Sequence, residues 1–210
     1  MPIAMRSSRR SASKPTRPFL TSGMTVGLFG GSFDPPHAGH KLVSDRLATA
    51  LGLDLVWWLV SPQNPLKQTR PGKMEERLQA CRALVKSARV HVSDEETRLG
   101  TANTIDTVRK LKAQYPGVSF IWLMGADNLA GLHRWKNWAG LMAQIPVAIY
   151  PRPGYQIRAG LSPAANRFAG QRLAAADARL LKTAQPPVWV MLEGRMDTNS
   201  STKLRHKKTL

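Results

Sequence analysis

Cysteine is almost absent from this chain of 210 residues, and that scarcity excludes several classes of protein. A single thiol, Cys81, rules out a disulfide scaffold, a cysteine-based zinc site and an iron–sulfur cluster. Long apolar runs are absent as well, because no stretch approaches the roughly 18 consecutive apolar residues that a membrane-spanning helix needs. We therefore expect a protein of the reducing, cytoplasmic compartment with no membrane partner.

Acidic residues are few, and the net charge is consequently high. Only 13 Asp and Glu oppose 31 Lys and Arg, which gives a formal charge of +18 with His neutral. An excess of this size is typical of proteins that bind polyanions, and nucleic acid is the first alternative to consider. Nine of the basic side chains lie in two acid-free end segments, 1–23 and 203–208, where they do not alternate with aromatic residues. No nucleic-acid module pattern accompanies them, so we expect no specific nucleic-acid partner.

The first residues of the chain differ in composition from the rest. Residues 1–23 are rich in Ser, Pro and Arg and lack hydrophobic periodicity, which predicts a disordered basic extension. An acid-free, Arg- and Ser-rich N-terminus is also the composition of an organelle transit peptide, and that alternative stays open. Residues 24–210 suit a single domain of ordinary size, with enough apolar residues for a packed core.

Apolar runs bounded by turn residues alternate with segments of helical periodicity through the body of the chain. Such alternation predicts an α/β fold in which helices cover both faces of a parallel sheet. Parallel sheets bind ligands beyond the carboxyl ends of their strands, where the strand order reverses. The predicted strands are 24–29, 53–60, 90–92, 118–124, 145–150 and 188–192. The predicted helices are 39–51, 73–87, 104–115 and 127–142, and residues 151–185 predict a loop followed by one helix.

The segment from Gly27 to His40 holds the most informative pattern, a strand that runs through two glycines into a helix. Gly30 and Gly31 let a ligand approach the backbone closely, because they carry no side chain. Two prolines precede a helix that begins near His37. His37 and His40 lie one turn apart on the same side of the positively polarised helix start. Imidazole and backbone N–H groups there can both donate to phosphate oxygens, so the pattern predicts a phosphate site.

A pair of histidines at this spacing can also be half of a metal site. The other three histidines, His91, His133 and His206, show no spacing that completes such a site. The chain also lacks a Walker A sequence and a G-x-G-x-x-G fingerprint. We therefore expect no metal held by His or Cys, and a phosphate site of another kind.

Two segments carry a family resemblance. Residues 30–40, Gly-Gly-Ser-Phe-Asp-Pro-Pro-His-Ala-Gly-His, resemble the first signature of the nucleotidylyltransferase superfamily. Residues 200–205, Ser-Ser-Thr-Lys-Leu-Arg, resemble its second signature near the C-terminal end. The resemblance implies a Rossmann-like sheet and the transfer of a nucleotidyl group from a nucleoside triphosphate.

Further segments narrow the resemblance to bacterial nicotinate-nucleotide adenylyltransferases, over residues 24–205. The implied reaction joins nicotinate mononucleotide and ATP into nicotinate adenine dinucleotide and pyrophosphate, a step of NAD biosynthesis. Such a reaction must hold two polyanions together, so it requires positioning and charge neutralisation and no protein nucleophile. The segments are 62–67, 101–107, 120–128, 133–138 and 150–154.

The resemblance implies that residues of the two signatures bind the phosphates of ATP. His37, His40 and Arg205 would act as the catalytic residues, stabilising the triphosphate and the charge that develops at the α-phosphorus. Mg²⁺ would be the cofactor, bound together with ATP. The other ATP- and phosphate-binding positions are Gly30, Gly31, Ser32, Phe33, Lys67, Gly125, Asp127, Ser201 and Thr202.

The second substrate, nicotinate mononucleotide, is assigned to Asn103, Thr104, Asp127 and Trp135, and the adenosine side to Arg152. The Trp135 indole would stack on the pyridine ring, and a Thr104 N–H group would face the carboxylate. Asn103 departs from the family, many of whose members have Tyr there. The four tryptophans of the predicted strands are expected in the core, at Trp57, Trp58, Trp122 and Trp189.

Related activities stay open at this point. Another adenylyl- or cytidylyltransferase of the superfamily could use phosphopantetheine or nicotinamide mononucleotide instead. A class I aminoacyl-tRNA synthetase shares the first His-containing motif, but this chain lacks the Lys-Met-Ser-Lys-Ser type of signature and is far shorter. Both a monomer and a homodimer are compatible with the sequence.

Overall fold

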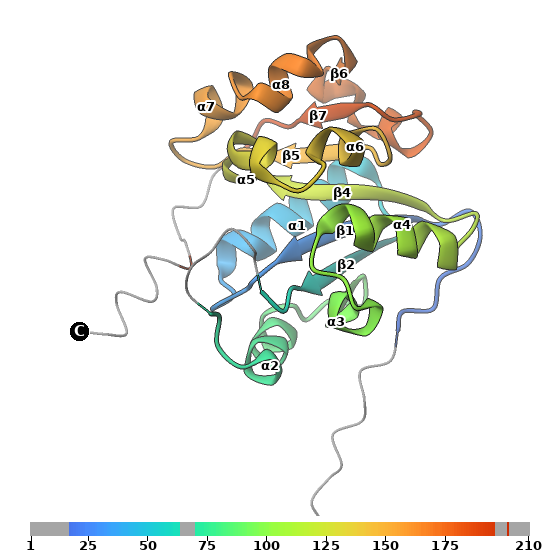
Figure 1. Ribbon diagram of the computed structural model, residues 1–210, viewed down its shortest axis with the longest axis vertical. Coiled ribbons are helices and arrows are strands. Elements are labelled where there is room, and N and C mark those ends of the chain that lie inside the picture. The colour runs from blue at the N-terminus through green and yellow to red at the C-terminus, as the bar shows by residue number, and fades with distance from the viewer. Residues whose placement is uncertain (1–16, 64–69, 196–200, 202–210) are drawn as a thin grey trace, which may run out of the picture.

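The sheet is built from short runs of Val, Leu, Ile and Trp, whose side chains suit a pleated and buried surface. The computed structural model describes residues 17–63 and 70–195 together with Ser201. Its strands are β1 (Thr25–Gly31), β2 (Leu55–Val60), β3 (Val90–Ser93), β4 (Ser119–Gly125), β5 (Val147–Tyr150), β6 (Arg172–Leu173) and β7 (Trp189–Met191). Within the described residues they form one parallel sheet in the order β3-β2-β1-β4-β5-β7-β6 (Figure 1).

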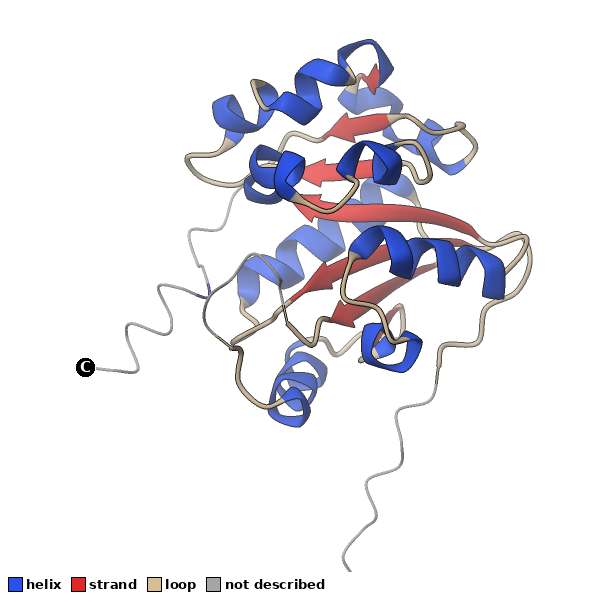
Figure 2. Ribbon diagram, in the orientation of Figure 1, coloured by secondary structure: helices blue, strands red, loops and turns tan. Residues whose placement is uncertain are grey.

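Helices cover both faces of this sheet, which confirms the predicted α/β architecture (Figure 2). No helix in the described part of the chain is both long and apolar enough to cross a bilayer. One face carries α1 (Ala38–Leu51), α2 (Met74–Leu84) and the 3-10 segment η3 (Ala175–Lys182). The other carries α3 (Glu95–Leu99), α4 (Thr104–Gln114), α5 (Ala126–Gly131), α6 (Trp138–Met142), α7 (Gln156–Gly160) and α8 (Pro163–Arg167). Two single 3-10 turns are η1 (Leu132–Arg134) and η2 (Ala169–Gln171).

The core has two apolar layers, and successive strand residues alternate between them. Trp57 and Trp58, adjacent in β2, point to opposite faces of the sheet. Their indole N–H groups donate to Ser93 Oγ (2.8 Å) and Ser44 Oγ (2.9 Å), so both buried donors are satisfied. All four tryptophans of the strands are at most 1% exposed, which confirms their predicted core positions.

The six predicted strands are confirmed with small shifts at their ends, whereas the single helix predicted at 127–142 is wrong. That segment contains α5, η1 and α6. Asn137 interrupts it, because its backbone lies in the left-handed region (φ 47°) and its side chain accepts from the Gly140 N–H group at 3.3 Å. Asn137 is thus the N-cap of α6, although it lies inside a segment of helical periodicity.

The prediction of one loop and one helix for residues 151–185 is also wrong. The segment contains α7, α8, η2, the short strand β6 and η3. Ser162 begins α8 by accepting from the Ala165 N–H group at 3.2 Å, and Pro163 follows it at the first turn. β6 and α3 were not predicted, because two and five residues are too few to show a period.

The described end of the N-terminal segment lies against the domain. Arg17 Nη2 lies 2.7 Å from Glu95 Oε1, and the Gly23 N–H group donates to the Gly117 carbonyl at 2.8 Å. Leu20 packs against the core layer that contains α4. Residues 17–23 thus contact the domain in this structure, and residues 1–16 lie outside the described part of the chain.

The centre of the sheet determines where a ligand can bind. β1 pairs with β2 on one side and with β4 on the other, so the strand order reverses between β1 and β4. All the strands are parallel, and their carboxyl ends therefore meet at one edge. The turns that follow β1, β2, β4 and β5 lie along that edge.

Candidate active site

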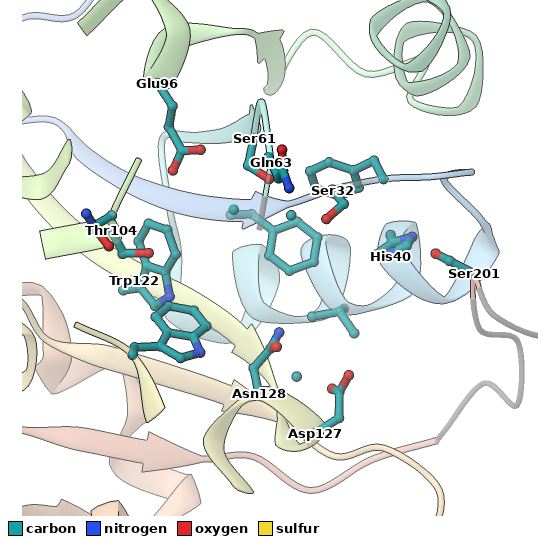
Figure 3. Close-up of a pocket in the computed structure, with 18 of the residues that line it drawn as sticks. Ser32, His40, Ser61, Gln63, Glu96, Thr104, Trp122, Asp127, Asn128 and Ser201 are labelled. Atoms are coloured by element: carbon teal, nitrogen blue, oxygen red, sulfur yellow. The ribbon is translucent and has the colours of Figure 1, made fainter. Parts of the chain in front are cut away.

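The carboxyl ends of β1 and β4 border a cavity of about 550 Å³ (Figure 3). It lies where the strand order reverses, the position expected for parallel sheets. Most of the predicted site residues line this cavity, although they come from distant parts of the chain. They are Gly30, Gly31, Ser32, Phe33, His37, His40, Asn103, Thr104, Gly125, Asp127, Trp135, Arg152 and Ser201.

An aromatic cluster fixes the turn between β1 and α1. Phe33 has a left-handed backbone (φ 46°), which is unusual for a residue with a large side chain. Its ring stacks on Trp58 with centroids 4.8 Å apart and meets Phe29 edge-on at 5.7 Å. A Cβ at Gly30 would lie 2.6 Å from the Trp122 ring, so only glycine fits there. The turn is thus held rigidly over the buried aromatic core.

The two histidines of this turn lie side by side with their rings tilted by 36°, on the same side of the helix start as their spacing predicts. Their ring centroids lie 3.8 Å apart, His37 precedes α1 as its N-cap, and His40 lies in the first turn. The His37 backbone N–H group donates to His40 Nδ1 at 3.2 Å. Because Nδ1 accepts this bond, the neutral His40 ring carries its proton on Nε2. His40 also meets the Phe33 ring edge-on at 5.0 Å, which fixes the direction of that donor.

The predicted second phosphate segment meets the first at one described residue. Ser201 Oγ donates to the Pro35 carbonyl at 3.0 Å, although the two residues are 166 positions apart. Figure 3 shows Ser201 beside His40 at one end of the cavity. Lys67, Thr202 and Arg205 lie outside the described residues.

The turns after β4 and β5 place an acid and a base side by side. Asp127 Oδ1 lies 3.7 Å from Arg152 Nε, and both side chains line the cavity. A Cβ at Gly125 would collide with the Asp127 carboxylate and would lie 2.8 Å from the Arg152 side chain. Gly125 is therefore required for this pair to form at the end of the strand.

The opposite end of the cavity has a polar lip and an indole wall. Asn103 is the N-cap of α4 and Thr104 its first residue, so backbone N–H groups at the start of this 11-residue helix face the ligand space. Trp122 and Trp135 pack edge to face at 6.3 Å, and both line the cavity. Figure 3 shows Thr104 and Trp122 at the end away from His40.

Ten lining residues were not predicted from the sequence. Six of them lie in segments that the resemblance singled out, and Phe29 lies in the first strand-to-helix segment, but no place in the site was assigned to any of them. Val43, Ser61 and Glu96 lie outside those segments and reach the cavity only through the fold. The full set is Phe29, Val43, Ser61, Gln63, Glu96, Ala102, Trp122, Asn128, Arg134 and Lys136.

Glu96 is the most unusual of these residues. It belongs to α3, is only 6% exposed, and lines the cavity. Burial raises the pKa of its carboxyl group from 4.5 to about 7. Two consecutive acids before Thr-Arg-Leu-Gly were the available sequence signal, but their pattern does not show which of these two buried residues lines the cavity.

Arg77 supports the cavity from behind and was also missed. This α2 side chain is 4% exposed, and its guanidinium donates to the carbonyls of Ser32 (2.7 Å), Ser61 (2.8 Å) and Gly72 (2.8 Å). Ser32 and Ser61 line the cavity on the turns after β1 and β2. One buried cation thus joins two site turns, and desolvation lowers its pKa.

The lone cysteine plays no part in this site. Cys81 is fully buried in α2, within the layer that also contains α1, and burial raises the pKa of its thiol to about 12. A buried thiol of this kind is unreactive at neutral pH. Cys81 is therefore a core residue.

This chain resembles known proteins over most of its length. A family model described as cytidylyltransferase-like matches residues 28–207. The chain is 51% identical over 182 residues to a probable nicotinate-nucleotide adenylyltransferase of Cereibacter sphaeroides, covering 87% of this chain and 97% of that protein. It is 50% identical over 189 residues to one of a Caulobacter species, covering 89% and 99%. A third, from Ruegeria pomeroyi, is 47% identical over 188 residues, covering 90% and 88%.

Solved structures show the same fold. Nicotinic acid mononucleotide adenylyltransferase of Plasmodium falciparum, complexed with APC, superimposes with a TM-score of 0.64 at 16% identity. The match covers 87% of this chain and 83% of that one. The same protein complexed with NaAD gives a TM-score of 0.64 at 17% identity, with the same coverage.

Proposed function

Because the chain belongs to the nicotinate-nucleotide adenylyltransferases, within the cytidylyltransferase-like family, we propose the following reaction. The enzyme transfers AMP from ATP to nicotinate mononucleotide, giving nicotinate adenine dinucleotide and pyrophosphate. The observation that supports it is the cavity itself, which has two adjacent histidines beside Ser201 at one end and two indoles beside the start of α4 at the other. One end suits phosphates and the other suits an aromatic acid.

In this reaction an oxygen of the mononucleotide phosphate attacks the α-phosphorus of ATP. The new P–O bond forms as the bond to the β-phosphate oxygen breaks, and pyrophosphate carries the electron pair away. Two polyanions must approach one another, so the main task of the protein is to position and neutralise them. No side chain has to act as a nucleophile.

His40 is the proposed donor to the charge that develops at the α-phosphoryl group. Its Nε2–H direction is set by the Nδ1 hydrogen bond and the Phe33 ring. His37 and the backbone at the start of α1 add donors to the same oxygens. We further propose that Ser201, Lys67, Thr202 and Arg205 hold the phosphates from the other side, as the resemblance implies.

Mg²⁺ fits the chemistry of the site. Asp127 Oδ1 is buried and has no hydrogen bond among the described residues. Mg²⁺ is commonly bound by one or two carboxylates together with substrate phosphates. We propose that Asp127 and the ATP phosphates hold the ion. When bound, it neutralises part of the triphosphate charge, while Arg152 lies beside Asp127 on the proposed adenosine side.

The indole end is proposed to bind nicotinate. Trp135, half-buried on the wall, offers a face to the electron-poor pyridine ring. The N–H groups at the start of α4 are proposed to donate to the carboxylate, with Asn103 and Thr104 at its edge. An amide in that place has a donor of its own, which these N–H groups cannot satisfy.

A substrate panel with ATP and Mg²⁺, read by pyrophosphate release, tests this function. We expect turnover with nicotinate mononucleotide. The kcat/KM with nicotinamide mononucleotide should be lower by tenfold or more, because one polar group left without a hydrogen bond costs about that much binding free energy. CTP and phosphopantetheine are the controls for the other activities of the superfamily. Turnover with phosphopantetheine but with neither pyridine nucleotide would overturn the proposal.

A further inference from the structure

One carboxyl group of the cavity has no part in the chemistry above. Glu96 is nine-tenths buried, and no hydrogen bond or ion pair joins its carboxyl oxygens to another residue of the described chain. Figure 3 shows this carboxyl group directed toward the part of the cavity that Thr104 and Trp122 line. This carboxyl group lines the cavity and has no protein partner there, so a polar group of a ligand is the expected partner.

The backbone holds Glu96 firmly in this position. Its carbonyl accepts from the Thr101 N–H group at 2.9 Å, and Gly100 closes the turn with a left-handed backbone (φ 61°). Thr101 Oγ1 and Thr107 Oγ1 share a buried hydrogen bond at 2.8 Å, which ties the turn to α4. Glu96 and the start of α4 therefore form one rigid unit.

Resting on the function proposed above, we propose that Glu96 determines specificity for the acid group of the pyridine, its neutral carboxyl donating a hydrogen bond to the nicotinate carboxylate. A neutral carboxyl has one O–H donor, whereas an ionised one only accepts. The nicotinate carboxylate only accepts, so it pairs with the neutral form and is repelled by the ionised form. The amide of nicotinamide carries its own N–H donors and suits the ionised form instead.

The protonation state of Glu96 is poised for this role. Burial is the sole cause that raises its pKa to about 7, and no neighbouring charge contributes. On α3 itself, Glu95 is paired with Arg17 and Arg98, and β2 contributes no charged side chain. From α4 the charged groups are Asp106, Arg109, Lys110 and Lys112, and Lys110 donates to the Leu99 carbonyl at 2.6 Å. Around the cavity they are His37, His40, Asp127, Arg134, Lys136 and Arg152.

Above neutral pH, Glu96 then takes up a proton when nicotinate mononucleotide binds. The negative ligand disfavours the ionised form of Glu96 further, so the bound complex holds the proton. Affinity for nicotinate mononucleotide therefore falls as pH rises above about 7, whereas affinity for nicotinamide mononucleotide does not fall for this reason. The choice between acid and amide becomes dependent on pH.

The experiment compares wild type with Glu96→Gln, whose amide donates at every pH. We expect the wild-type kcat/KM for nicotinate mononucleotide to fall about tenfold per pH unit above 7, the slope for one required proton. In Glu96→Gln this part of the fall is absent. Ionisation of the substrate phosphate is common to both enzymes, so the difference between the two profiles reports Glu96. Glu75→Gln, which removes an exposed acid on α2, is the matched control and keeps the wild-type slope.

Two further measurements separate specificity from folding. Glu96→Ala should lower kcat/KM for the acid about tenfold or more at pH 6.5 and change the KM for ATP little. Titration calorimetry at pH 8, in buffers of different ionisation enthalpy, should show one proton taken up with nicotinate mononucleotide by wild type and none by Glu96→Gln. An unchanged slope in Glu96→Gln, or an equal loss toward both acceptors in Glu96→Ala, overturns the role of Glu96 while leaving the proposed function intact. A wild type inactive with both pyridine nucleotides overturns the proposed function as well.

Discussion

At the scale of single residues, the site depends on side chains whose direction is set by their neighbours. The His40 ring is enclosed by the Phe33 and His37 rings and accepts a backbone hydrogen bond at Nδ1. A donor held in this way needs no reorganisation during the reaction, and that is the main source of the catalytic effect we propose for it.

His40→Ala should lower kcat by about 10²- to 10³-fold and leave the fold intact, because it removes one preorganised donor. Steady-state pyrophosphate release measures the loss, and the circular dichroism spectrum reports the fold. His133→Ala is the matched control, since His133 is exposed on η1 and does not line the cavity. Wild-type turnover in His40→Ala would remove this residue from the mechanism.

Glu96 should also make stability depend on pH. The pKa of Glu96 in the folded protein is about 7, above the ordinary value of 4.5. The contribution of its protonation to the free energy of unfolding is therefore fully present below pH 4.5 and is lost as pH rises through 7. The loss amounts to about 3 kcal/mol at 1.36 kcal/mol per pKa unit. Urea unfolding of wild type and Glu96→Gln at pH 5 and pH 8 should show that the variant gains relative stability at the higher pH. Equal pH dependence in the two proteins would contradict the buried position of the carboxyl group.

At the scale of helices and strands, the sequence predicted those features of the site that depend on a local sequence pattern. The first motif lies on a strand and a long helix, and its two histidines lie side by side as their spacing predicts. Arg77 could not be predicted in the same way. Its partners are carbonyls of three separate turns, which carry no mark in the sequence. Asn137 shows the same limit, because a polar residue in a periodic segment does not reveal a left-handed backbone.

Arg77→Lys should weaken the site through the two turns that Arg77 joins. A lysine keeps the charge but cannot reach three carbonyls with a planar fork, so the Ser32 and Ser61 carbonyls lose donors. We expect a loss of about 1–3 kcal/mol in stability, together with a raised KM for ATP. Thermal unfolding and steady-state kinetics measure the two effects.

The control for this change is Arg82→Lys, on the exposed side of the same helix, where neither quantity should move. Reduced stability with an unchanged KM for ATP in Arg77→Lys would show that the guanidinium supports the fold alone.

At the scale of the whole molecule, the charge excess has more than one origin. Much of it lies at the ends of the chain, and Arg17, counted among those end charges, forms an ion pair with the buried Glu95. Other basic side chains, Arg134, Lys136 and Arg152, line the cavity. The high charge that suggested nucleic acid is thus divided between structural pairing and a cavity proposed to hold two nucleotides.

Removal of residues 1–23, so that the chain begins at Met24, should therefore destabilise the enzyme. It leaves Glu95, which is fully buried, without its 2.7 Å partner, and it removes the Leu20 contact with the core. A loss of about 1–3 kcal/mol is expected on thermal or urea unfolding. Removal of residues 1–16, which keeps Arg17, is the control and should cost little. Equal stability of the two shortened chains would show that the Arg17 contact contributes nothing.

The position of β1 between β2 and β4 also governs when the cavity can form during folding. β2 follows β1 closely in the chain, but Thr25 of β1 pairs with Ser119 of β4, and closing so long a loop is entropically slow. A nascent chain on the ribosome that ends before β4 has the glycine and histidine turn but no opposite wall. Nucleotide binding therefore cannot assist the first steps of folding, and the N-terminal half must await the rest of the sheet before a ligand can stabilise it.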